Sequence, residues 1–208
     1  MQSLLGAGAK NSPAAPYCQA VGPEERGETM RDDSGEDLDH AMMRRCLACA
    51  RDGVAAGEFP FACVIARGEE VICAASNRTK RDGDVTRHAE MVAMTQAQTL
   101  LGRGALRGCT LYTTVEPCPM CSFAVRETGI ARVVFAIYSP LMGGHSRWDV
   151  LADRALSGRM GEVFAAPPQV RGGVLVEEVA QLWRRAHPLA WGVIRWRGVF
   201  RLAAEPQA

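Results

Sequence analysis

The sequence predicts an α/β domain built in layers. Apolar residues recur at helical spacing in some segments and form short runs rich in β-branched residues in others, and the two kinds alternate along the chain. The chain has 208 residues, a length typical of one domain or of one domain with extensions. Its composition, 48% hydrophobic and 23% charged, is typical of a globular protein.

The predicted elements begin after a polar start. Residues 1–36 are rich in Gly, Pro, Ala and acidic residues without a sustained period, which predicts a flexible N-terminal tail. Helical spacing then predicts a helix from Asp37 to about Gly57. The stretch FPFACVIARGEEVICAASN predicts two strands joined by a turn near Gly68, and KRDGD predicts a loop.

The second half continues the alternation. HAEMVAMTQAQTLLG predicts a helix ended by Gly102, CTLYTTV a strand, the residues after Cys118 a helix to about Gly129, and ARVVFAI a strand. YSPLMGGHS predicts a loop, RWDVLADRAL a helix, and GGVLVEEVAQLWRRA a short strand followed by a helix. AWGVIRWRGVFRL alternates apolar and basic residues and predicts an extra strand, with a packed tail as the alternative. We expect a domain over residues 37–187 and a C-terminal extension over 188–208.

Charge and hydropathy narrow the class of partner. The formal net charge of +1 gives no reason to expect a broad nucleic-acid-binding face, although a local basic patch is compatible with it. No apolar run reaches the roughly 20 residues of a membrane span. The N-terminus lacks the basic start and the long apolar stretch of a signal peptide, so we expect a cytoplasmic protein without a membrane partner. Most of its cysteines are then expected to be reduced and buried.

Two short motifs carry the chemistry. The triplet HAE (residues 88–90) opens a predicted helix, and PCPMC (residues 117–121) follows about 26 residues later, where a strand feeds the next helix. This order matches the zinc-deaminase signature, H-x-E followed by P-C-x-x-C. Imidazole nitrogen and thiolate sulfur are the ligands that zinc prefers, and three protein ligands leave a fourth position for water.

The signature predicts a role for each side chain. We expect His88, Cys118 and Cys121 to hold one zinc ion per chain, with a bound water. Glu90 lies two residues after His88 and therefore off its helix face, which argues against Glu90 as a fourth ligand. We predict that Glu90 takes a proton from the activated water and then passes protons to the ring and to the departing ammonia.

Each half-motif alone has other interpretations. A lone C-x-x-C also fits a redox pair, in which Cys118 and Cys121 cycle as a disulfide. A lone H-x-E usually consists of exposed residues on a helix without a functional role. A structural zinc clip normally adds a fourth Cys or His close to the third ligand, and none lies near His88 in sequence. The two half-motifs together, in order, favour catalytic zinc.

From about Leu38 to Ala186 the sequence resembles the cytidine deaminase-like superfamily, within it the nucleoside and guanine deaminases and the bacterial tRNA adenosine deaminases. The resemblance lies in HAE and EPCPMC, and in EFPFACVI, SNRTKRDGDVTRHAE, LYTTVEPCPMCSFAV and ARVVFA. It implies a three-layer α/β/α fold with a central mixed sheet, hydrolytic deamination with zinc, and a homodimer.

The resemblance also implies substrate contacts. Asn77 matches an asparagine that hydrogen-bonds a purine ring, Ala89 a position whose backbone amide contacts the substrate, and Phe61 a position that lines the base pocket. His145 and Trp148, in the loop after the last core strand, differ from the family pattern and are further candidates for substrate contact. A surface loop histidine and a tryptophan packed in the core are the alternatives for these two.

These features favour a zinc-dependent deaminase that removes an exocyclic amine from a nucleobase or nucleoside, most simply a purine-like one, and releases ammonia. The first alternative is a tRNA adenosine deaminase, for which the arginines near the C-terminus would form a phosphate patch. The second alternative is a zinc-bearing binding module without activity. The intact Glu90 argues against that module, because a silent protein has no use for a proton shuttle.

Overall fold

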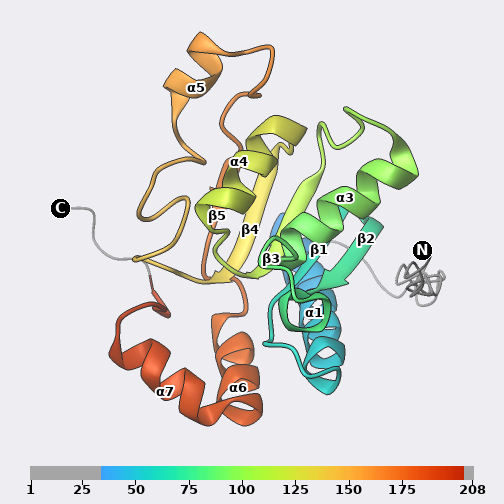
Figure 1. Ribbon diagram of the computed structural model, residues 1–208. Coiled ribbons are helices and arrows are strands. Elements are labelled where there is room, and N and C mark those ends of the chain that lie inside the picture. The colour runs from blue at the N-terminus through green and yellow to red at the C-terminus, as the bar shows by residue number, and fades with distance from the viewer. Residues whose placement is uncertain (1–33, 204–208) are drawn as a thin grey trace, which may run out of the picture.

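The computed structural model describes residues 34–203 and contains a five-stranded sheet in the order β2-β1-β3-β4-β5 (Figure 1). β1 pairs antiparallel with both β2 and β3, whereas β3–β4 and β4–β5 are parallel. The sheet is therefore mixed, as predicted. The strands span β1 Ala62–Arg67, β2 Glu70–Ser76, β3 Thr110–Val115, β4 Arg132–Ile137 and β5 Gln169–Arg171.

Helices cover both faces of the sheet. α1 (Ser34–Ala55) and α6 (Val176–Ala186) pack on one face, and α3 (Ala89–Leu101) and α4 (Pro119–Thr128) on the other. Alternate residues of β1 serve the two layers, because strand side chains point to opposite faces in turn. The predicted three-layer α/β/α fold is confirmed. None of the described helices is long and apolar enough to cross a membrane.

Several predicted boundaries hold. Gly102 follows the last residue of α3, and Gly129 follows the last residue of α4 in the left-handed conformation that favours glycine. Ile65 and Ala66 of β1 bracket an irregularity in the pairing with β2, and Gly68 lies in the turn between these strands. α1 begins at Ser34, inside the predicted tail, and residues 1–33 of that tail lie outside the described residues.

The predicted C-terminal strand is wrong. Residues Pro188–Trp196 form a helix, α7. Pro188 is its first residue, a position at which the fixed φ of proline suits a helix and no N–H is missed. One side of α7 packs inward through Trp191, while Leu189 and Trp196 are exposed. Apolar residues on both sides of the helix produced the alternation that the sequence pattern predicted as a strand.

Three further segments differ from prediction. The helix expected over RWDVLADRAL begins later, as α5 (Arg154–Arg159). Asp149 adopts a left-handed φ of 54°, and Asp153 caps the start of α5 by accepting a hydrogen bond from the Ala155 N–H. The short strand expected in GGVLV lies earlier, as β5, and Leu175 has a φ of 51° just before α6. The KRDGD loop starts inside a short helix, α2 (Thr79–Asp82).

A buried carboxylate ties α1 to the sheet. Asp39 accepts two hydrogen bonds from Arg132, at 2.5 and 2.7 Å, one from Arg171 at 2.7 Å, and one from the Tyr112 hydroxyl at 3.2 Å. Burial favours the neutral acid, but the hydrogen bonds and charges of the two arginines outweigh it and lower the pKa of Asp39. The network joins α1 to β3, β4 and β5.

Candidate active site

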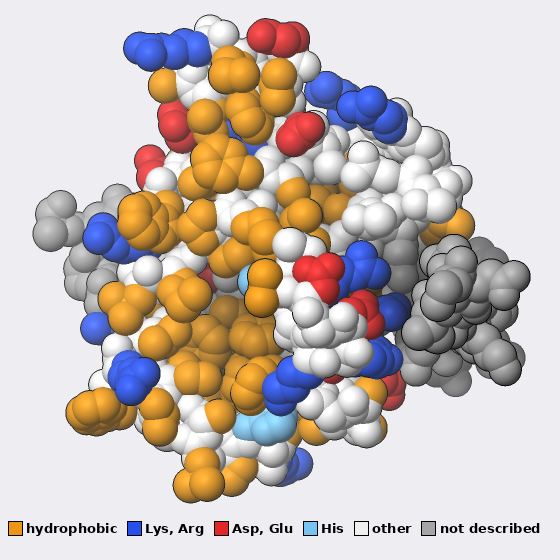
Figure 2. Space-filling view, in the orientation of Figure 1, with side chains coloured by type: hydrophobic (Ala, Val, Ile, Leu, Met, Phe, Trp, Pro, Cys, Tyr) orange, Lys and Arg blue, Asp and Glu red, His pale blue; other side chains and the backbone are white. Residues whose placement is uncertain are grey.

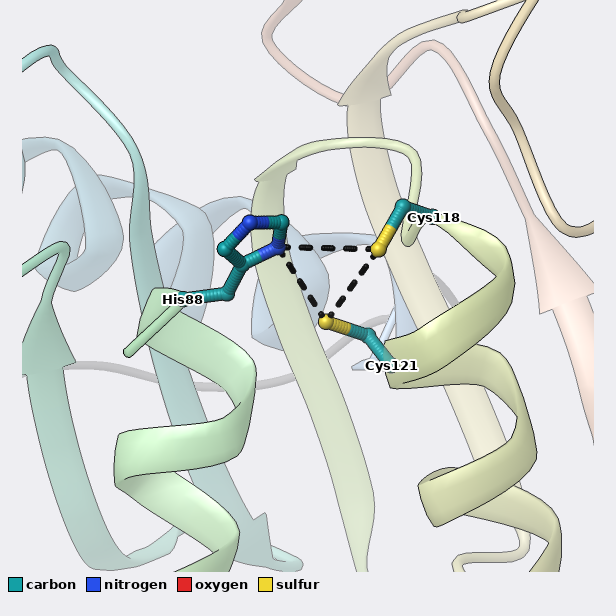
Figure 3. Close-up of side chains that lie close together, drawn as sticks. All are labelled: His88, Cys118 and Cys121. Atoms are coloured by element: carbon teal, nitrogen blue, oxygen red, sulfur yellow. Dashed lines mark hydrogen bonds between the residues drawn. The ribbon is translucent and has the colours of Figure 1, made fainter. Parts of the chain in front are cut away.

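The site lies where α3 and α4 begin. His88 is the residue immediately before α3, and Cys118 is the residue immediately before α4. This position usually carries a side chain that caps the helix, but neither of these side chains makes a capping hydrogen bond. They turn toward each other instead, as Figure 3 shows. The unpaired N–H groups and the dipole at a helix start favour a thiolate there.

The three predicted ligands come together in a tight triangle (Figure 3). His88 Nδ1 lies 3.5 Å from Cys118 Sγ and 3.6 Å from Cys121 Sγ, and the two sulfurs are 3.6 Å apart. Zinc bonds of about 2.0–2.3 Å at tetrahedral angles would place such atoms roughly 3.6–3.8 Å apart. Within the described residues, this ligand group has no fourth member. The donor set and its spacing therefore fit zinc with one coordination position left open.

The hydrogen bond between the two thiols shifts their pKa values in opposite directions. The hydrogen bond from Cys121 lowers the pKa of Cys118 to about 4, with His88 adding to the effect. The same hydrogen bond raises the pKa of Cys121, since Cys121 is the donor and is also buried. A dithiol that already holds one thiolate beside an imidazole needs to lose only one further proton when it binds a cation.

Glu90 faces this triangle from the first turn of α3. Its carboxylate is buried, at 7% exposure, and Oε1 accepts a hydrogen bond from the Thr113 hydroxyl at 2.8 Å. Oε2 lies 3.6 Å from Cys121 Sγ, on the side of the ligands. Burial raises the pKa of Glu90, and the hydrogen bond from Thr113 opposes that rise. A carboxyl group with a raised pKa is suited to accept and return a proton near neutral pH.

A second buried carboxylate organises the loop after β4. Glu116, at 4% exposure, precedes the PCPMC motif. It accepts hydrogen bonds from the Ser139 N–H at 2.8 Å, the His145 N–H at 3.0 Å, and the N–H and hydroxyl of Ser146, both at 2.7 Å. The loop 139–146 is thereby fixed to the residue next to the candidate metal ligands.

A cavity of about 320 Å³ opens in front of the triangle. Aromatic and aliphatic side chains supply most of its surface, and polar side chains lie among them, a combination that is usual for small-molecule sites. Figure 2 shows hydrophobic side chains gathered in and around a hollow on this face. The lining residues are Phe59, Phe61, Asn77, Thr79, His88, Glu90, Val115, Glu116, Cys118, Ser139, Met142, Ile194, Val199 and Phe200.

Asn77 is held in one orientation at the cavity. Its side-chain N–H groups donate to Glu58 Oε2 at 2.9 Å and to Thr79 Oγ1 at 2.7 Å. Glu58 is fully buried and also accepts from the Arg81 N–H at 2.8 Å. Since an amide carries two N–H donors, the carbonyl oxygen of Asn77 is the group left to accept from a ligand.

The other predicted contacts divide into two groups. Phe61 lines the cavity, and Ala89 lies fully buried at the start of α3, between the two residues of the first motif that line it. His145 and Trp148 are not among the lining residues. The His145 ring lies 6.5 Å from the Phe135 ring, and the Trp148 ring is 56% exposed with the Arg147 guanidinium 5.0 Å away.

Sequence reasoning missed part of the site. Glu116 could have been found, because a charged residue at the end of an apolar strand and beside a metal motif is costly unless it has partners. Ile194, Val199 and Phe200 had no such signal, since they resemble any other apolar residues of a C-terminal segment. Their place in the cavity depends on how α7 packs.

Comparisons with known proteins agree with this geometry. The tRNA-specific adenosine deaminase of Aquifex aeolicus is 36% identical over 120 residues, which cover 57% of this chain and 80% of that protein. The family described as "Cytidine and deoxycytidylate deaminase zinc-binding region" matches residues 36–137. This chain belongs to that deaminase family. The family match contains both motifs and ends with the last residue of β4.

Other similar proteins have names that give different activities. A tRNA(Ile)-lysidine synthase of Deinococcus deserti is 37% identical over 149 residues. The alignment covers 71% of this chain but 26% of the synthase, so this chain spans about a quarter of the length of the synthase. A structure from a study of A-to-I editing by tRNA:A34 deaminases has a TM-score of 0.61 and 29% identity, with 68% of this chain and 98% of that chain covered. A guanine deaminase from Nitrosomonas europaea has a TM-score of 0.57 and 26% identity, with 71% and 83% covered.

Proposed function

We propose that this protein is a zinc-dependent hydrolytic deaminase that removes an exocyclic amine from a purine-like nucleobase or nucleoside and releases ammonia. One observation carries the proposal. The buried carboxylate of Glu90 lies 3.6 Å from Cys121 Sγ, beside the ligand triangle and on the wall of a mainly apolar cavity. A proton carrier, a metal triad and a ring-sized apolar space in one place are the parts that this reaction needs.

The mechanism assigns each side chain a task. His88, Cys118 and Cys121 would hold the zinc ion, which supplies Lewis-acid activation of water when bound. Glu90 would accept the two protons of the attacking water one after the other, and would pass the first to the ring nitrogen and the second to the leaving amine. The Thr113 hydroxyl holds Oε1 of Glu90, which keeps Oε2 directed at the ligands. The apolar lining limits the access of bulk water to the reacting groups.

The proposed substrate contacts are residues that line the cavity or lie next to the first motif. The carbonyl oxygen of Asn77 would accept a hydrogen bond from a ring N–H, and its orientation is set by Glu58 and Thr79. Phe61 offers an aromatic surface for the ring. The amide of Ala89 is the third proposed contact. The guanine deaminase among the similar structures supports a purine-like substrate.

A tRNA adenosine deaminase is the second candidate. It is supported by the Aquifex aeolicus relative and by the similar structure from the study of tRNA:A34 deaminases. Two of the arginines predicted to form a phosphate patch are already engaged, since Arg184 pairs with Glu177 at 3.2 Å and Arg195 donates to the Phe200 carbonyl at 2.7 Å. We therefore rank this function second. The homodimer and the single zinc per chain stay predictions.

Ammonia release by purified protein of known zinc content tests the proposal. The panel contains guanine, adenine, cytosine, their nucleosides and a tRNA anticodon stem-loop. Release from a base or a nucleoside supports the proposed function. Release from the stem-loop alone transfers the function to tRNA modification. A protein that holds zinc and releases no ammonia from any compound would be the silent binding module.

A further inference from the structure

The C-terminal segment forms one wall of the cavity. The residues of this segment that line the cavity are Ile194 near the end of α7, Val199 and Phe200. Phe200 is 5% exposed, and its ring lies edge-on to Phe61 at 6.3 Å and to Trp183 at 5.4 Å. All three wall residues lie beyond residue 137, where the family match ends. The wall therefore belongs to the part of the site that the common zinc-binding region does not specify.

This wall is fastened to the sheet. The Tyr138 N–H donates to the Arg201 carbonyl at 3.0 Å, and the Arg201 N–H donates to the Tyr138 carbonyl at 2.9 Å. The Arg195 guanidinium closes the turn by donating to the Phe200 carbonyl at 2.7 Å. Tyr138 directly precedes Ser139, which also lines the cavity. The segment is thus held against the end of β4 by paired backbone hydrogen bonds.

Polarity is distributed unevenly around the cavity. The polar lining residues come from the segments around the two motifs and from the start of the loop after β4, whereas Ile194, Val199 and Phe200 offer no hydrogen-bonding side chain. These polar residues are Asn77, Thr79, His88, Glu90, Glu116, Cys118 and Ser139. Phe59 and Phe61 add to the apolar lining of the cavity. A hydroxyl buried there without a hydrogen-bond partner is disfavoured, and a phosphate is disfavoured more strongly.

The nearest cation to this aromatic surface is already engaged. Lys80 Nζ lies 3.7 Å from the centre of the Phe59 ring and donates to the Gly57 carbonyl at 3.3 Å. A phosphate next to the cavity would have to compete with both contacts. The cavity volume of about 320 Å³ lies at the lower end of the range for small-molecule sites.

We propose that the wall of Ile194, Val199 and Phe200 determines specificity and restricts the substrate to a free nucleobase, in preference to a nucleoside, a nucleotide or RNA. The inference rests on the proposed deaminase function. A free base carries its polar edge on one side, which suits the polar residues around the two motifs, and presents a flat ring without hydroxyls to the apolar wall. Attached ribose would bring hydroxyls toward that wall.

The test compares wall variants with a matched control. Ile194→Ala and Val199→Ala widen the cavity at half-buried positions, and Val193→Ala removes an exposed side chain of α7 that does not line it. We measure kcat/KM for guanine, guanosine, guanosine monophosphate and the stem-loop, and for the adenine series. The wild type should prefer the base, and each wall variant should narrow the base-to-nucleoside ratio by about tenfold or more. The control should leave the ratio unchanged.

Calorimetric binding separates the inference from the proposed function. Titration of the zinc-loaded protein with guanine and guanosine needs no turnover, so the wall can be judged even if no ammonia is released. Tighter binding of guanine than of guanosine, with the difference lost in the wall variants, supports the proposed role of the wall. If the same protein releases no ammonia, the deaminase function is refuted separately. The inference is overturned if the wild type binds or converts the nucleoside, the nucleotide or RNA as well as the free base, or better. It is also overturned if neither wall variant changes the base-to-nucleoside ratio.

Discussion

The carboxylate of Glu116 occupies the space into which a side chain at Gly143 would have to extend. Gly144 is restricted in the same way by the Ser122 hydroxyl, and its N–H donates to the Pro117 carbonyl at 2.8 Å. The loop after β4 therefore lies in close contact with the residues around the second motif. Two glycines in sequence make this approach feasible, and Glu116 supplies the acceptors that hold it.

Gly143→Ala should loosen the loop. The added methyl group cannot avoid the Glu116 carboxylate unless that hydrogen-bonded side chain or the loop backbone moves, and we expect a loss of about 1–3 kcal/mol in the free energy of unfolding. KM should rise, because Ser139 and Met142 of this loop line the cavity. Urea denaturation and steady-state kinetics check both effects. Gly158→Ala is the control, since nothing lies within 4 Å of its added methyl group. Equal stability of the two variants would contradict the described packing.

Glu90→Gln should abolish turnover without removing zinc. The amide is nearly the same size as the carboxyl group but cannot carry a proton, and general acid–base groups contribute about 10²–10⁴-fold to rate. We expect kcat to fall by that order while zinc per chain, measured by atomic emission, stays at the wild-type value. Glu127→Gln, an exposed change on α4, is the control. Substantial residual activity in the Glu90 variant would remove this residue from its proposed role.

Cys121→Ala should lose zinc. Only one thiolate and one imidazole of the triangle would remain, so metal analysis after dialysis should find almost none. Because metal binding stabilises the folded state, a chelator should lower the melting temperature of the wild type and leave that of the variant unchanged. Cys49→Ala is the control, because burial raises the pKa of that thiol to about 12 and it lies on α1. Full zinc in the Cys121 variant would refute the ligand assignment.

Asp39→Asn should lower the free energy of unfolding at neutral pH. It should also make that free energy less dependent on pH in the acid range. Since the two arginines lower the pKa of Asp39 in the folded protein, its ionised form stabilises the fold above the unfolded-state pKa of about 3.9, and this contribution is lost as pH falls through the lower folded value. We expect a loss of about 1–3 kcal/mol at neutral pH, and a difference from wild type that shrinks below about pH 4.

The matched control for this network is Glu36→Gln. Glu36 pairs with Arg171 at 2.9 Å but is 54% exposed, and exposed pairs contribute little. Denaturation midpoints of both variants and the wild type, measured across the acid range, provide the comparison. A constant difference between wild type and Asp39→Asn at every pH would show that the carboxylate charge is not what stabilises α1 against the sheet.

The metal triangle could be predicted from sequence because each of its two motifs is local and their order along the chain is characteristic. A C-x-x-C at a helix start sets the spacing of its own sulfurs, and a strand before each motif brings the two helix starts to the same edge of the sheet. The fold class was predictable for a related reason, since β-branched runs such as CTLYTTV and the helical spacing of HAEMVAMTQAQTLLG have clearly different periods. Both inferences needed only short sequence patterns and their order along the chain.

The C-terminal wall could not be predicted in the same way. α7 has apolar residues on its inner side, such as Trp191, and on its outer side, such as Leu189 at 87% exposure, so its pattern matches neither period well. The overlooked signal was Pro188, which is common at the first position of a helix. Which residues of this segment reach the cavity depends on contacts distant in sequence, such as Phe200 with Phe61.

The separation of the proposed ligands along the chain has a consequence for folding. His88 and Cys118 are 30 residues apart, and the segment between them contains all of α3 and β3. A metal ion joining them would act as a covalent-like cross-link that closes this loop. By the chain-entropy estimate for cross-links, closing a loop of about 30 residues is equivalent to about 3–4 kcal/mol. Zinc would then fasten the antiparallel and parallel halves of the sheet together, in addition to serving the reaction.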